Sequence, residues 1–129
     1  MKHLNLFFLI IFSVLLISGK SFGSPIAITS NTVWSSISPA PTSSDAITVQ
    51  NGATLYVDIS NAVCASIQLG GTGWFSGNGT LSFNSNSQLT VTGDITFGYI
   101  ILFLGFTSGS LDMSNGGILR IAGSMTAPN

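Results

Sequence analysis

The chain has 129 residues, of which 45% are hydrophobic and 5% are charged, and its formal net charge is −1. Beyond residue 20 the only strong base is Arg120, so the sequence offers no basic surface for phosphates, which argues against nucleic-acid binding. The single histidine is His3, so the rest of the chain cannot form a Ser-His-Asp or Cys-His catalytic arrangement or a histidine zinc site.

Residues 1–23 predict a cleaved secretory signal peptide. Lys2 and His3 precede an apolar stretch at 6–17, and the Ser-Phe-Gly sequence at 21–23 fits a small-x-small cleavage site. The apolar stretch has about a dozen residues, fewer than the roughly 20 that a membrane-spanning helix needs, although a membrane anchor is the alternative. We therefore expect a secreted or cell-surface, extracellular protein with no membrane span in its mature part.

The mature part divides into a lead-in and a single domain. Residues 24–44 are rich in Ser, Thr and Pro, and Pro25, Pro39 and Pro41 argue against a helix there. From 45 to 129, hydrophobic and polar residues alternate between glycine-rich turns, which is typical of strands with one buried face. The expected inward-facing pairs are Ile47 and Val49, Leu55 and Val57, Ile67 and Leu69, Leu81 and Phe83, Leu89 and Val91, Ile95 and Phe97, Leu111 and Met113, and Leu119 and Ile121.

The domain also contains an internal repeat. A shift of 30 residues aligns residues 79–96 with 109–126 without a gap and places inward positions on inward positions. Repeats of this length are typical of solenoids, in which each unit buries its inner face against the next. We expect residues 45–129 to form an all-β, right-handed parallel β-helix. A β-sandwich is the alternative, because strands about 8–12 residues apart also suit that fold.

Several segments carry a resemblance to a known class of proteins. These are residues 41–45 (PTSSD), 47–58 (ITVQNGATLYVD), 64–69 (CASIQL) and 89–95 (LTVTGDI). From Trp34 to about Thr96, the chain resembles the opening of the β-helical regions in large secreted surface proteins of Bacteroidetes-type bacteria. It is similar, more loosely, to the eight-glycine domain of extracellular proteins.

That resemblance implies a long protein with adhesive or carbohydrate-related modules downstream and often a C-terminal sorting domain. This sequence departs from the pattern, because it stops at Asn129 without such a domain. We therefore expect either a fragment or a solenoid whose open end needs a partner.

The residues that support catalysis or metal binding are sparse. The acids are Asp45, Asp58, Asp94 and Asp112, and no two lie close in sequence, so only the fold could pair them for glycoside hydrolysis. The lone Cys64 lies among small and apolar residues, and we expect it to be buried and unreactive. The sequence predicts no enzyme activity, no metal and no cofactor.

Two aromatic residues are the candidate ligand-binding residues. Trp74 and Phe75 lie between two glycine clusters, where a turn would display them for stacking on sugar rings. The alternative is that they fold over an end or corner of the core, and we expect Trp34 to cap the first coil in that way.

The run 99–106 (YIILFLGF) breaks the alternation, and we expect a strand buried on both faces. At an edge, the same run would be a sticky surface for another chain. The partners expected are glycans or other surface proteins, with self-association through the open solenoid end or the 99–106 run. The sequence thus predicts a structural or adhesive β-solenoid module. A carbohydrate-binding module is the alternative, and an enzyme acting on polysaccharides comes third.

Overall fold

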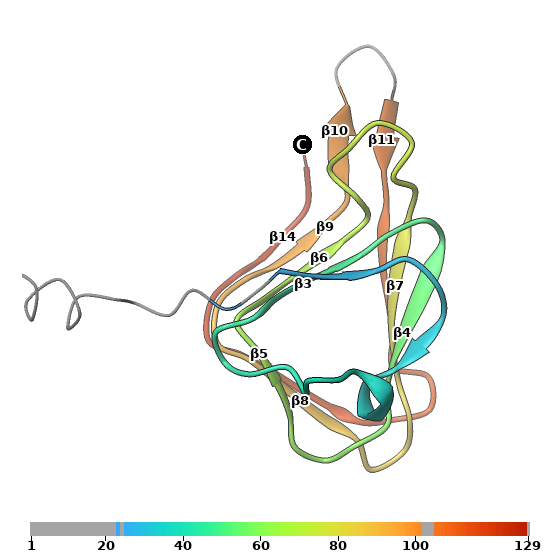
Figure 1. Cartoon of the computed structure of the whole chain (residues 1–129). Coiled ribbons are helices and arrows are strands. Elements are labelled where there is room, and N and C mark those ends of the chain that lie inside the picture. Colours follow the sequence, from blue (N-terminus) through green and yellow to red (C-terminus); the bar gives the residue numbers. More distant parts are fainter. Residues whose placement is uncertain (1–22, 24, 102–104, 129) are drawn as a thin grey trace, which may run out of the picture.

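The strands of the chain stack into successive coils around one interior (Figure 1). The computed structural model describes residues 23, 25–101 and 105–128, so the expected signal peptide lies outside the described residues except for Gly23. The coils form a parallel β-helix of about three turns, which confirms the expected fold class and excludes the β-sandwich. In the described part of the chain, no helix is long and apolar enough to cross a membrane.

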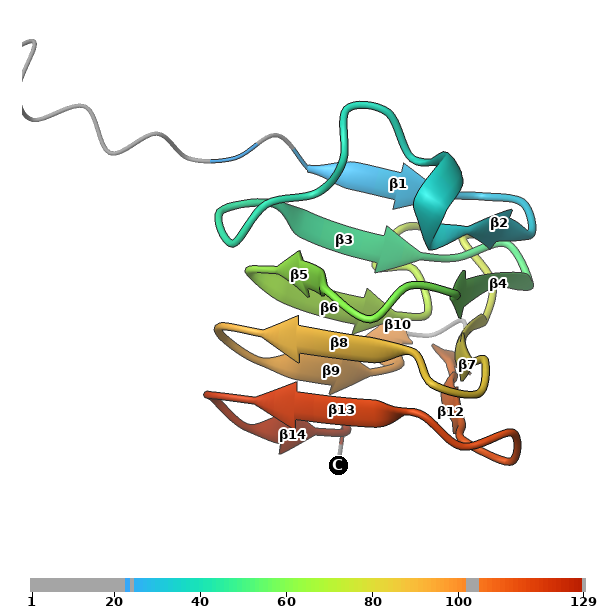
Figure 2. The same ribbon diagram turned by 90° about the horizontal axis from the view of Figure 1, so that it is seen from below.

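Three parallel sheets form the sides of the solenoid (Figure 2). The first contains β1 (Ile26–Ile28), β3 (Ala46–Val49), β6 (Ser66–Leu69), β9 (Ile95–Phe97) and β14 (Met125–Thr126). The second contains β2 (Thr32–Val33), β4 (Ala53–Val57), β7 (Gly79–Phe83) and β12 (Gly109–Asp112). The third contains β5 (Ala62–Cys64), β8 (Gln88–Val91) and β13 (Ile118–Ile121).

The strand register confirms the 30-residue repeat. Leu81 pairs with Leu111 and Leu89 with Leu119, so each residue of the last coil lies next to the residue 30 positions earlier. Earlier coils are shorter, because Ile67 pairs with Ile47 on one side and with Ile95 on the other. The interior therefore repeats regularly while the length of each coil varies.

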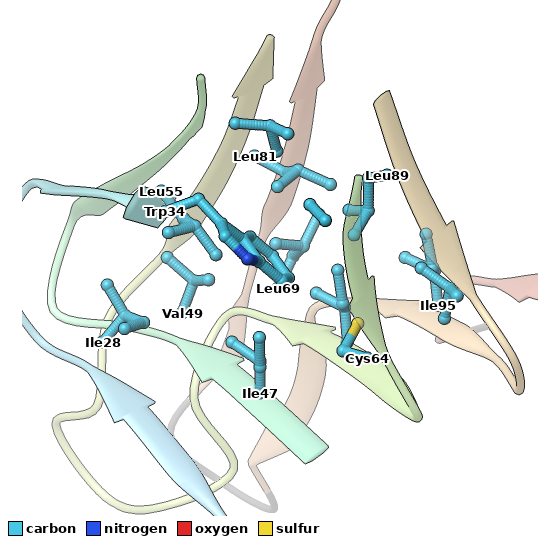
Figure 3. Packing of buried hydrophobic residues seen from close by; sticks show 14 of the residues in the cluster. Ile28, Trp34, Ile47, Val49, Leu55, Cys64, Leu69, Leu81, Leu89 and Ile95 are labelled. Carbon is cyan, nitrogen blue, oxygen red and sulfur yellow. The ribbon is translucent and has the colours of Figure 1, made fainter. Parts of the chain in front are cut away.

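The interior is filled by aliphatic side chains that point inward from all three sheets (Figure 3). Alternation in the sequence produces this arrangement, because successive side chains of a strand point to opposite faces. Cys64 is fully buried among them. The fully buried hydrophobic side chains of the two middle coils include Leu55, Val57, Ile67, Leu69, Leu81, Phe83, Leu89, Val91 and Ile95.

The first coil begins within residues 24–44, the stretch expected to be a lead-in. β1 pairs in parallel with β3, and β2 pairs in parallel with β4. A single 3-10 turn, η1 (Trp34–Ser36), follows β2 and places Trp34 in the core, where it is 2% exposed. The stacking thus starts at Ile26 rather than at residue 45.

The run 99–106 is not a strand buried on both faces, so that expectation is wrong. It contributes to two short antiparallel strands, β10 (Tyr99–Ile101) and β11 (Gly105–Thr107), while residues 102–104 lie outside the described residues. Tyr99, Ile100 and Phe106 are exposed. The physical reason is that β9 and β12 already occupy the sheets on either side of this corner, so the run leaves the solenoid, and no second layer formed by the described residues covers it.

Candidate functional site

One corner of the solenoid grows from coil to coil. The connection between the first and second sheets has three residues in the first two coils (29–31 and 50–52), then nine (70–78) and finally eleven (98–108). Figure 1 shows β10 and β11 projecting from this corner beside the loop that joins β6 to β7. The two longest connections therefore lie side by side on adjacent coils.

Backbone hydrogen bonds hold the base of the 70–78 loop. The amide of Gly71 donates to the carbonyl of Gly77 at 3.0 Å and closes the loop. The amides of Asn51 and Gly52 donate to the carbonyls of Ser76 and Asn78 at 2.6 and 2.7 Å, which ties the loop to the shorter turn of the preceding coil. Only the tip of the loop is left to project.

The β10–β11 ribbon is fixed to that loop by side chains. The Gln68 amide nitrogen donates to the carbonyls of Gly70 and Gly98, at 3.0 and 2.9 Å. The buried Thr107 hydroxyl donates to the carbonyl of Gly71 at 3.0 Å. These bonds link the roots of both connections, so the surface that they carry has a defined base.

The tips of both connections gather exposed apolar side chains. Trp74 is 72% exposed, Phe75 92% and Phe106 77%, and Tyr99 and Ile100 are also exposed. We call these five residues the aromatic corner. Large apolar side chains exposed together on a protein surface mark interaction sites more often than scattered ones do.

The aromatic corner forms the walls of two shallow hollows. One, of about 290 Å³, is lined by Thr72, Trp74, Tyr99, Ile100 and Ile101. The other, of about 260 Å³, is lined by Phe75, Ser76, Gly77, Asn78, Ile101, Phe106 and Thr107. Each hollow therefore has an aromatic side chain from each connection, together with hydroxyl or amide groups.

The structure places both expected ligand-binding residues at this corner, and neither folds over the core. Phe75 has a φ angle of 66°, which is unusual for a bulky residue, and its side chain is 92% exposed. Tyr99 and Phe106 were not among the expected ligand-binding residues, because the run 99–106 was predicted to be buried. One signal in the sequence did point to them. The alternation of hydrophobic and polar residues is interrupted at 99–106, about 30 residues after a similar interruption at 70–78.

The four aspartates bond to nearby serines or threonines. Asp45 accepts from the amide and hydroxyl of Thr42, and Asp94 accepts from the amide of Ser124 at 2.7 Å. Asp112 accepts from the amide of Ser114, and this bond is the main reason that its pKa lies below the ordinary value. These acids stabilise turns and join neighbouring coils.

The carboxylate of Asp58 also accepts hydrogen bonds, from the amide and the hydroxyl of Ser35 in the preceding coil. Partial burial acts to raise its pKa, but the hydrogen bonds from Ser35 outweigh that effect and lower it. Within residues 23, 25–101 and 105–128, no three histidine, cysteine or acidic side chains cluster as a metal site would require.

Comparison with known proteins adds no relative. No family model, curated protein or solved structure matches the chain.

Proposed function

We propose that the chain is a structural or adhesive β-solenoid module, secreted or displayed on a cell surface, that works without catalysis. The aromatic corner is its contact surface. The observation that carries the proposal is the gathering of Trp74, Phe75 and Phe106 from two adjacent coils onto one exposed corner with a hydrogen-bonded base. The bonding of each aspartate within the fold supports a role without catalysis, since these acids serve turns and coil contacts.

Adhesion of coated beads tests this proposal. Beads that carry the purified protein would be washed over surfaces coated with the same protein or with insoluble polysaccharides (cellulose, chitin and xylan). We expect retention on at least one surface, and we expect Trp74→Ala combined with Phe106→Ser to remove it. Ile118→Thr is the matched control, because Ile118 is an exposed hydrophobic residue on the last coil, away from the corner. Equal loss in the control would contradict the role of the corner.

The second candidate is a carbohydrate-binding module. The connections 70–78 and 98–108 contain no charged residue, and the hollow between Trp74 and Tyr99 also carries the Thr72 hydroxyl. Aromatic faces stack on the apolar faces of sugar rings while hydroxyl groups bond at their rims. This chemistry favours neutral sugars. Saturable binding of soluble neutral oligosaccharides, lost in Trp74→Ala and kept in Trp74→Phe, would select this candidate over adhesion by apolar contact alone.

A further inference from the structure

The two hollows of the aromatic corner lie next to each other. Ile101 lines both of them, Trp74 lines the first and Phe75 lines the second. Trp74 and Phe75 are consecutive residues, so their Cα atoms are about 3.8 Å apart. One ligand that lies along the tip of the loop can therefore contact both hollows.

Each hollow has its own aromatic walls. Trp74 and Tyr99 belong to the first hollow, and Phe75 and Phe106 belong to the second. In each pair, one ring comes from the 70–78 loop and the other from the β10–β11 ribbon, which Figure 1 shows beside it. Because aromatic rings stack on apolar faces, a ligand that fills both hollows needs two such faces in succession.

The size of the hollows limits what each of them can hold. Their volumes are about 290 and 260 Å³. Pockets for drug-sized ligands have volumes of roughly 300–1,000 Å³, so each hollow has room for a single ring rather than for a longer ligand. The pair together can accommodate two successive rings.

The second hollow also contains an amide that is held in place. The backbone amide of Ser108 donates a hydrogen bond to Oδ1 of Asn78 at 2.8 Å, and Asn78 lines the hollow with Phe75 and Phe106. Since only the oxygen of the side-chain amide can accept this bond, its NH2 group is left as a donor. This group makes no hydrogen bond to any residue that the structure describes. The hollow therefore offers a hydrogen-bond donor beside its apolar walls.

The distribution of charge favours a neutral ligand at this place. Among residues 23, 25–101 and 105–128, the only basic residue is Arg120, which lies on β13 in the third sheet. The connections 70–78 and 98–108, which carry the hollows, lie between the first and second sheets and contain no acidic residue. An acidic sugar would find no cation here, and a cationic ligand would find no carboxylate.

We propose that the aromatic corner binds two successive rings of an unbranched neutral glycan, one ring in each hollow. Each ring stacks on the aromatic walls of its hollow, and Asn78 donates to an oxygen of the ring beside Phe75 and Phe106. This inference rests on the carbohydrate-binding candidate described above. It adds the length of the recognised unit and assigns each ring its own hollow.

The dependence of affinity on ligand length tests the proposal with the unaltered protein. Isothermal titration calorimetry would compare fragments of one, two and three rings from cellulose, chitin and xylan. In at least one series we expect the second ring to raise the affinity at least about tenfold, and the third to change it less than about threefold, because no hollow remains for it. An equal affinity for one and two rings, a further tenfold rise with the third ring, or no binding in any series would overturn the proposal.

Substitutions in the two hollows test whether each holds one ring. Trp74→Ala removes a wall of the first hollow, and Phe106→Ser removes a wall of the second. Each variant alone should bring the affinity for two rings to within about threefold of the affinity for one ring. Ile118→Thr, an exposed site on the last coil away from the corner, is the control and should keep the gain from the second ring. Circular dichroism checks that the variants fold, and an undiminished gain in either corner variant would overturn the proposal.

The outcome also separates this site from the adhesive role. Beads retained on surfaces coated with the same protein, without binding of any glycan fragment, would overturn the two-ring site and leave adhesion intact. Binding of two-ring fragments as expected, with no retention of beads on any surface, would contradict adhesion and leave the two-ring site intact.

Discussion

The carboxylate of Asp58 accepts two hydrogen bonds from Ser35, one from the backbone amide at 3.0 Å and one from the hydroxyl at 2.5 Å. Ser35 belongs to the 3-10 turn that carries Trp34. Asp58 follows β4 in the next coil. This pair therefore fastens the turn that closes one end of the solenoid to the coil beneath it.

Replacing Asp58 tests that fastening. Asp58→Ala removes both acceptors, and we expect it to lower the free energy of unfolding by about 1–2 kcal/mol, as measured by urea denaturation. Asp58→Asn keeps one acceptor for the Ser35 amide and should lose less. Because the pKa of Asp58 is lowered in the fold, its stabilisation is present at neutral pH and is lost as the pH falls below about 3.8. An acid-induced loss of stability that is the same in Asp58→Asn and in the wild type would contradict this account.

Gly79 lies against the backbone of the preceding coil. A Cβ there would meet the backbone carbonyl of Val49 and the backbone nitrogen of Gly70, neither of which can rotate away. We expect Gly79→Ala to destabilise the protein by about 1–3 kcal/mol, as overpacked cores do. Gly73→Ala is the control, since its nearest neighbours lie 3.9 Å or more from the added carbon. Thermal unfolding followed by circular dichroism compares the two, and equal shifts would show that the close contact does not matter.

Cys64 should be inert at neutral pH. Burial, with a smaller effect from the charge of Asp45, raises the pKa of its thiol to about 12. We expect a thiol-specific chromogenic reagent to label it only after unfolding. A raised thiol pKa means that the unfolded state loses its proton first, so stability falls as the pH rises above about 9. Cys64→Ala should show a shallower decline between pH 8 and 10.5, and rapid labelling of the folded protein would refute the prediction.

The two tryptophans occupy opposite environments. Trp34 is 2% exposed and Trp74 is 72% exposed, so a neutral quencher should reach only the second. We expect strong acrylamide quenching in Trp34→Phe, where Trp74 is the remaining indole, and weak quenching in Trp74→Phe. We also expect Trp34→Ala to cost about 3–5 kcal/mol of stability, as losses of large buried aromatic residues do. A similar cost for Trp74→Ala would mean that Trp74 is not displayed.

Much of the interior follows from the sequence because burial in a solenoid is periodic. Ile47, Val49, Leu55 and Val57 alternate with polar residues, and all four are buried as expected. The 30-residue shift in the sequence is also the shift in the strand register. The repeat length and the alternation of hydrophobic and polar residues are properties of the sequence itself, so they can be recognised before the fold is known.

The corner does not follow in the same way. The connections at 70–78 and 98–108 show no periodic pattern of hydrophobic residues. They lie side by side only because the coils that carry them stack, which neither segment shows on its own. The prediction for the hydrophobic run at 99–106 was wrong for this reason. Hydrophobicity alone predicts burial, but it does not show whether another part of the fold lies close enough to bury the run. The glycines on both sides of Trp74 and Phe75 did indicate a turn that displays them, and Trp74 is exposed whereas Trp34 is buried.

The three-, three-, nine- and eleven-residue connections show that one corner of this solenoid tolerates insertion. The strands on both sides keep their parallel register although the segments between them differ almost fourfold in length. Loops exchanged or lengthened at this position would change what the surface presents while leaving the stack intact. The corner is thus the place where new recognition sequences can be grafted, in the laboratory or by natural variation, with least effect on folding.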